Sequence, residues 1–211
     1  MIRPTLLRLA LAGALTATLA VAAGGCALLK SPPPVQTYRF GGTAAAAEAP
    51  ASTVESVQVL LRRIEFPQAS EGDKILGVNG AETAYIKGAR WISDARDLYT
   101  ASLEGAFAAQ SSRVRLIGPR ELTPAAKALA LDVRTFEARY AQAGGAPEVV
   151  MTVRARVLTM PDRRVSAEQT FSVTQPATAN RVGAIVEAFD IATRDINAQL
   201  VAWMDRNAGE V

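Results

Sequence analysis

Apolar residues recur with helical spacing in two stretches of the chain. The stripe of the later stretch is Val182, Ile185, Val186, Phe189, Thr193, Ile196, Leu200 and Trp203, and the residues outside it are Glu187, Asp190, Arg194, Asp195 and Asn197. The earlier stripe, which predicts a helix over residues 94–110, is Ile92, Ala95, Tyr99, Leu103, Ala106 and Phe107. Stripes at this period are typical of helices that pack on a core. We expect Ser93 and Asp94 to cap the earlier helix.

Alternation of apolar and polar residues predicts strands in other parts of the chain. The runs are 55–63, 74–78, 82–86, 113–117, 129–136, 149–157 and 165–173. The second and third runs flank Asn79-Gly80, a pair that favours a two-residue hairpin turn. The last two runs predict a long antiparallel hairpin with one apolar and one polar face. In the run before them, Phe136 falls in the polar register, so we expect a bulge or bend near Thr135.

The predicted order of elements is strands, a helix, four strands and a final helix. This order predicts an α/β fold of one domain, with a mixed, mostly antiparallel sheet and two main helices packed on it. One helix on each face of the sheet is an arrangement that would suit this pattern. We assign residues 54–206 to the domain and residues 207–211 to a short tail.

The first 25 residues have the layout of a secretory signal peptide. Arg3 and Arg8 precede an apolar stretch from Leu9 to Ala23, and two glycines then precede Cys26. This ending resembles the lipobox of bacterial lipoproteins, whose cysteine carries a diacylglycerol and whose new amino terminus is acylated, palmitate being a typical acyl chain. The alternative is a membrane-spanning helix, but an apolar run of about 15 residues is shorter than the roughly 20 that a bilayer requires. We therefore predict cleavage of residues 1–25 and lipidation of Cys26.

Residues 26–53 are predicted to link this anchor to the domain. Lys30 to Pro34 contains three consecutive prolines, which favour an extended spacer. A short strand is predicted near residues 37–40, and Gly41 to Thr53 has the low complexity of a loop that need not pack.

Composition narrows the classes of function. After removal of the signal peptide, 21 Lys and Arg residues face 20 Asp and Glu residues, and no groove of basic and aromatic residues is evident, so nucleic acid is not an expected partner. The chain has no histidine, and its one cysteine is assigned to lipid. Histidine-dependent nucleophilic sites are thereby excluded, and a metal site would need carboxylates alone. We predict no catalytic residues, no metal and no cofactor.

Four stretches together resemble the ABC-type transport auxiliary lipoprotein family, whose members are encoded with Mla-like and Pqi-like lipid-transport systems. The stretches are Cys26 with residues 37–40 (TYRF), residues 84–91 (AYIKGARW), residues 129–137 (LALDVRTFE) and the final helix. The resemblance implies a mixed α/β domain and a non-enzymatic, periplasmic partner of a membrane ABC transporter that carries an MCE substrate-binding subunit. Ala27, which follows Cys26 where an Asp would favour the inner membrane, agrees with sorting to the outer membrane.

Tyr85, Arg90 and Trp91 are the candidate partner-binding residues, because Tyr, Arg and Trp dominate interface hot spots. The alternative is structural, with Trp91 in the core and Arg90 paired locally. Three further functions stay open beside the adaptor role. They are a lipid-binding carrier, which needs an apolar cavity of several hundred Å³, an activator of peptidoglycan synthesis, and an enzyme with carboxylates converging in a cleft.

Overall fold

The computed structural model describes residues 35–42, 56–119, 121 and 123–207. The predicted signal peptide, Cys26, the proline spacer, most of the 41–53 loop and most of the tail lie outside these residues. Within the described part of the chain, no helix combines the length and the apolar character needed to cross a bilayer.

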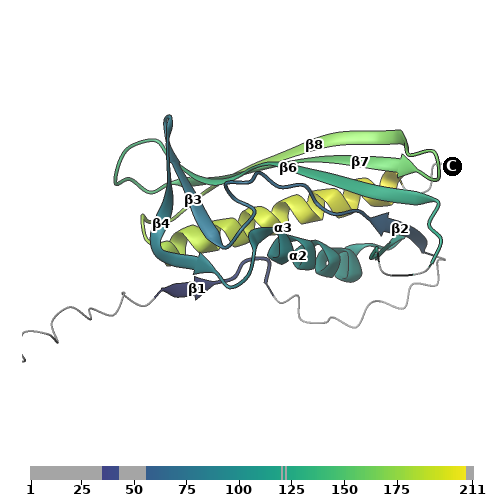
Figure 1. The fold of residues 1–211 in the computed structure, drawn as a ribbon, viewed down its shortest axis with the longest axis horizontal. Coiled ribbons are helices and arrows are strands. Elements are labelled where there is room, and N and C mark those ends of the chain that lie inside the picture. Colours follow the sequence, from purple (N-terminus) through teal and green to yellow (C-terminus); the bar gives the residue numbers. More distant parts are fainter. Residues whose placement is uncertain (1–34, 43–55, 120, 122, 208–211) are drawn as a thin grey trace, which may run out of the picture. The chain divides into compact units, whose positions relative to one another are not determined.

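Strand β6 is the axis of an eight-stranded mixed sheet (Figure 1). Along one side it pairs antiparallel with β7, which pairs antiparallel with β8. Along the other side it pairs in parallel with β2 near its beginning and with β3 near its end. Beyond β2 lies β5, and beyond β3 lie β4 and then β1. The strands are β1 (Gln36–Tyr38), β2 (Val57–Leu61), β3 (Lys74–Asn79), β4 (Glu82–Trp91), β5 (Val114–Ile117), β6 (Lys127–Tyr140), β7 (Glu148–Thr159) and β8 (Arg164–Pro176).

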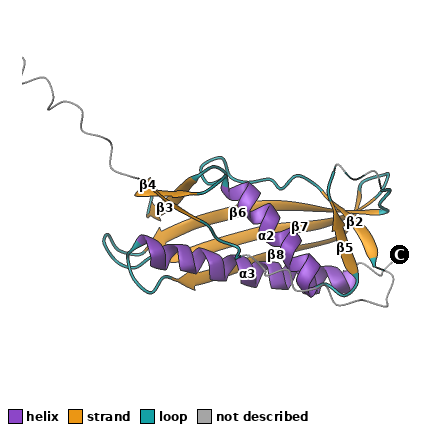
Figure 2. Cartoon of the chain, turned by 90° about the horizontal axis from the view of Figure 1, so that it is seen from below, coloured by secondary structure: helices purple, strands orange, loops and turns teal. Residues whose placement is uncertain are grey.

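Both helices lie on the same face of this sheet. Helix α3 (Val182–Asn207) contacts β7 and β8, and α2 (Ala95–Gln110) contacts α3 and β5 (Figure 2). The predicted fold class is confirmed, whereas the arrangement with one helix on each face is wrong. The reason lies in the long hairpin, which offers only one apolar face. Its inward residues, such as Val153, are buried, while its outward residues include the ion pair between Arg154 and Glu168.

The predicted bulge in β6 is confirmed. Val133 pairs with Val153 and Thr135 pairs with Thr152, so Arg134 is the extra residue between two regular stretches of the ladder. The inserted residue shifts the alternation by one position. Phe136 consequently points into the core, as Val133 does before the bulge.

The β3–β4 hairpin has a different turn from the one predicted. Asn79 pairs with Glu82, so the two central residues are Gly80 and Ala81 and not Asn79 and Gly80. Gly80 has φ +59°, which suits a glycine in the first central position of a hairpin turn. Strand β4 is also longer than the predicted 82–86, and the register shift after Tyr85 includes Gly88 at φ +75°.

Helix α2 begins without the side-chain cap predicted for it. Asp94 is the N-cap residue, but its side chain makes no capping hydrogen bond. The amides of Ala95 and Arg96 instead donate to the carbonyls of Gly72 and Glu71, because the preceding loop lies against the helix start. Ile92, which the stripe placed on the core, is 56% exposed.

Helix α3 buries one polar residue that the periodicity placed outside. Asn197 is buried at the interface with α2, and its Nδ2 donates to Ser102 Oγ at 3.0 Å. An amide can occupy this position because a hydroxyl from the other helix accepts one of its hydrogen bonds.

Four aromatic rings from distant parts of the chain form the centre of the core. Phe136 of β6 lies 4.7 Å from Phe189 of α3 and 5.2 Å from Phe40, between ring centroids. Trp91 of β4 lies 4.8 Å from Phe40 and 5.3 Å from Phe189. We call Phe40, Trp91, Phe136 and Phe189 the aromatic cluster. It joins the segment after β1, the end of β4, the second half of β6 and the first half of α3.

Truncation of Phe189 to alanine should destabilise the domain by about 3 to 5 kcal/mol, because it leaves a cavity against Phe136 and Trp91. Thermal unfolding measures this loss, with Ile92→Ala as the control, since that exposed side chain should contribute little. An unchanged melting temperature for Phe189→Ala would contradict the central place of this ring.

Candidate functional site

The three predicted partner-binding residues lie on β4 but do not share a surface. Tyr85 is 46% exposed and Arg90 is exposed, whereas Trp91 is only 2% exposed. Alternation along the strand explains the difference, because Ala89 and Trp91 both point into the core and Arg90 between them points out. Trp91 therefore supports the surface from beneath.

Neighbouring strands extend the exposed part of β4 into a continuous surface. Arg90 pairs in register with Lys74 of β3 on one side and with Thr37 of β1 on the other. The Lys74 Nζ atom lies 4.8 Å from the centre of the Tyr85 ring, within the range of a cation–π contact. We call Thr37, Lys74, Tyr85 and Arg90 the β4 surface.

Arg90 is held by a local ion pair. Its Nη1 donates to Asp73 Oδ2 at 2.8 Å, and both side chains are well exposed to solvent. The pair neutralises part of the charge of the surface and sets the direction of the guanidinium. Lys74 makes no ion pair with another described residue, so its positive charge is not neutralised by a salt bridge within the described part of the chain.

A small groove of about 290 Å³ opens beside Tyr85, between the β3–β4 hairpin and the loop after β6. Its apolar walls include Val78, Ile86 and the ring of Tyr140. Gly77 permits this ring to lie close, since a Cβ there would meet Tyr140 Cε2 at 3.3 Å. Burial raises the pKa of the Tyr140 hydroxyl. The groove can receive an apolar side chain of a partner.

Sequence reasoning missed Lys74 and Tyr140 as neighbours of Tyr85. Tyr140 reaches the groove because β3 pairs in parallel with the end of β6, with Asn79 opposite Tyr140. No local pattern indicates that pairing, which joins strands about 60 residues apart in the chain.

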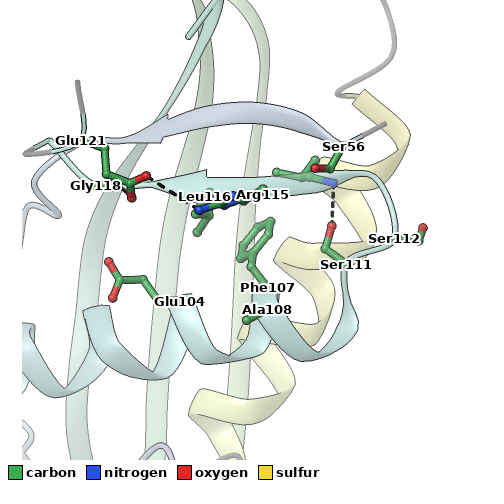
Figure 3. A pocket seen from close by; sticks show the side chains of 11 residues that line it. Ser56, Glu104, Phe107, Ala108, Ser111, Ser112, Arg115, Leu116, Gly118 and Glu121 are labelled. Carbon is green, nitrogen blue, oxygen red and sulfur yellow. Dashed lines mark hydrogen bonds and ion pairs between the residues drawn. The ribbon is translucent and has the colours of Figure 1, made fainter. Parts of the chain in front are cut away.

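A larger pocket of about 540 Å³ lies between α2 and β5 (Figure 3). Glu104 of α2 and Glu121 line it, and Arg115 Nη2 approaches Glu121 Oε2 at 4.0 Å. Burial, followed by repulsion from Glu121, raises the pKa of the Glu104 carboxyl. A carboxyl with a raised pKa can act as a general acid, but an enzyme site also needs a partner group in reach of a substrate.

The serines of this pocket serve the packing of the two helices. Ser111 Oγ donates to Asp205 Oδ1 of α3 at 2.5 Å and accepts from the Val114 amide at 2.9 Å. The Ser112 amide donates to Asp205 Oδ2 at 3.0 Å. Asp205 therefore joins the end of α2 to α3, and the hydroxyls of Ser111 and Ser112 both donate to its carboxylate. The described residues also contain no group of three acidic side chains that could hold a metal ion.

Comparison with known proteins finds a matching family model and solved structures with a similar fold. A family model described as "ABC-type transport auxiliary lipoprotein component" matches residues 38–201. The crystal structure of protein XCC0632 from Xanthomonas campestris is similar, with 25% sequence identity, a TM-score of 0.66 and coverage of 83% of this chain and 95% of that chain. A crystal structure of an uncharacterized protein shares the fold at 12% identity, with a TM-score of 0.58 and coverage of 82% and 96%. The sequence matches no curated protein.

Glu104→Gln should stabilise the protein at pH 7 but not at pH 4. The folded state binds the Glu104 proton more tightly than the unfolded state, so stability falls as pH rises from the ordinary glutamate pKa of about 4.3 through the raised one. Glutamine removes this dependence. Melting temperatures at the two pH values measure the effect, with Glu187→Gln on the exposed side of α3 as the control. A stabilisation by Glu104→Gln that is the same at both pH values would contradict the assignment.

Proposed function

This chain belongs to the ABC-type transport auxiliary lipoprotein family, and on that basis we propose that it is a non-catalytic adaptor in an MCE-linked system that moves lipid between membranes. The observation that carries the proposal is the extent of the family match, which runs from Tyr38, the last residue of β1, into α3. It includes the whole aromatic cluster and three residues of the β4 surface, Lys74, Tyr85 and Arg90. The family description itself supports an auxiliary role beside an ABC-type transporter. The MCE subunit as direct partner is our proposal, supported by the sequence resemblance.

We further propose that Cys26 carries the lipid anchor and that the anchor lies in the outer membrane, with the domain in the periplasm. The small residues before Cys26 and Ala27 after it support this assignment. One acyl chain binds a membrane reversibly, whereas the three chains of a mature lipoprotein would make attachment effectively permanent. The adaptor would then meet its partners only at a membrane.

The partner-binding surface that we propose is the β4 surface, with Tyr85 and Arg90 as the residues that contact the MCE subunit. Trp91 acts indirectly, because its contacts with Phe40 and Phe189 fix the strand that carries them. An exposed tyrosine that lies beside an apolar groove and contacts Lys74 fits a partner segment with an apolar side chain and a carboxylate placed near Lys74.

A lipid-carrier role is the alternative, and the size and charge of the pockets favour the adaptor over it. The apolar groove beside Tyr85 holds about 290 Å³, at the lower limit for a small-molecule site. The pocket of about 540 Å³ between α2 and β5 is lined by Glu104, Arg115 and Glu121, which do not suit an acyl chain. A further pocket of about 810 Å³, between the end of β2 and the first half of α2, is lined by charged residues such as Arg62, Arg96 and Asp97 and does not suit one either.

Capture of the lipidated protein from detergent-solubilised envelopes tests the proposed function. We expect an MCE subunit, with the ATPase and permease of its transporter, among the captured proteins identified by mass spectrometry. Capture of a peptidoglycan synthase without any MCE subunit would instead support a role in activating cell-wall synthesis, and bound phospholipid without protein partners would support the carrier.

Arg90→Ala should weaken capture of the MCE subunit without lowering the melting temperature. The pair with Asp73 is exposed, and exposed ion pairs contribute only about 0 to 1 kcal/mol to stability. Arg134→Ala is the matched control, because Arg134 also forms an exposed pair, with Asp132, on the outer face of β6. If Arg90→Ala and the wild type captured equal amounts of the MCE subunit, Arg90 would not be part of the binding surface.

A further inference from the structure

The residues that follow the predicted spacer are bound to the domain by their backbone. In β1, Gln36, Thr37 and Tyr38 pair in parallel with Ala89, Arg90 and Trp91 of β4. The Ile92 amide then donates to the Tyr38 carbonyl at 2.8 Å. The chain is therefore attached to the edge of the sheet as soon as it enters the described domain.

Phe40 and Gly41 attach the same segment to the core. The Phe40 side chain is buried in the aromatic cluster, against Trp91 and Phe136. Gly41 follows with φ +78°, and a Cβ at this position would overlap the Cβ of Ser102 on α2. Only glycine fits this approach without displacing the helix.

A carboxylate of α3 completes the attachment. Asp190 Oδ1 accepts hydrogen bonds from the amides of Gly41 at 2.8 Å and Gly42 at 3.1 Å. Asp190 Oδ2 accepts from Arg194, one turn later, at 3.1 Å. Hydrogen bonds to a charged acceptor are stronger than those between neutral groups. Residues Val35–Gly42, which we call the clamp, are thus held by β4, α2 and α3 together.

We propose that the clamp makes the lipid tether end at Val35, so that the β4 surface is held close to the anchoring membrane and meets its partner there. This inference rests on the anchor at Cys26 and the partner surface proposed above. Val35 is the ninth residue after Cys26, and a chain of nine residues spans at most about 32 Å. Without the clamp, the tether would continue to Val57 of β2 and would be more than three times as long.

The clamp also determines how far from the anchoring membrane the partner can be bound. Thr37 of the clamp lies directly opposite Arg90, so the attachment point and the proposed contact residues are neighbours. The partner segment should therefore be one that approaches the anchoring membrane to within a few tens of Å, and not one near the opposite membrane. The clamp also makes the position of the β4 surface insensitive to residues 43–55, which come after it in the chain.

Two insertions of the same flexible segment test the proposal. A 12-residue Gly-Ser segment, with a mean end-to-end distance of about 19 Å, is placed after Lys30 in one variant and after Ala46 in the other. Each lipidated protein carries Thr83→Cys, whose thiol is the only free one once Cys26 is acylated, for attachment of a donor fluorophore. The proteins are reconstituted into phosphatidylethanolamine–phosphatidylglycerol vesicles that contain an acceptor-labelled lipid. Cys26→Ser, which lacks the anchor, is the control for transfer without attachment.

We expect energy transfer to fall with the insertion after Lys30 and to stay at the level of the parent protein with the insertion after Ala46. Equal losses with both insertions would overturn the proposal, because the tether would then continue past the clamp. No loss with either would also overturn it, because the tether would not set the distance. Asp190→Ala combined with Phe40→Ala should make the second insertion behave like the first, provided that circular dichroism shows a folded domain.

Capture from envelopes extends the test to the partner. The insertion after Lys30 should reduce capture of the MCE subunit, and the insertion after Ala46 should not. Undiminished capture with the first insertion would contradict engagement close to the membrane. If the parent protein captured no MCE subunit, the proposed function would fail, whereas the vesicle measurement would still decide whether the clamp holds.

Discussion

The packing of Phe136 is the constraint on which the structure of this domain depends. This ring contacts Phe40, Phe66, Trp91 and Phe189, which come from four separate stretches of the chain. It reaches them only because the bulge at Arg134 changes the alternation of β6. Aromatic pairs in these geometries contribute beyond their buried area. The clamp, β4 and α3 are consequently fixed relative to one another by one cluster.

This constraint connects the segment that follows the proposed anchor to the proposed partner surface. Trp91 enters the cluster from the strand that exposes Tyr85 and Arg90, and Phe40 enters it from the segment that follows the predicted tether. The role suggested for Trp91 at an interface is therefore an indirect one. A residue that is almost fully buried cannot contact a partner, but it can hold two neighbouring exposed residues in place.

Local periodicity was sufficient to predict both helices, the long β7–β8 hairpin and the bulge in β6, because each depends on residues close together in the sequence. The pairing of β2 and β3 with opposite ends of β6 has no such signal, so the groove formed by Tyr85 and Tyr140 was not predicted. The burial of Asn197 was also not predicted, because its hydrogen-bond partner Ser102 lies on another helix. The prediction of the β3–β4 turn was wrong by one residue, because an Asn-Gly pair favours a turn without determining which two residues are central.

Hydrogen exchange of residues 36–42 in the full-length lipidated protein, bound to vesicles and followed by mass spectrometry, tests the central claim most directly. If the aromatic cluster holds the clamp, these amides should exchange about as slowly as those of β4 with which β1 pairs. Exchange of residues 36–42 at the rate of an unprotected peptide, while β4 and α3 stay protected, would contradict the account.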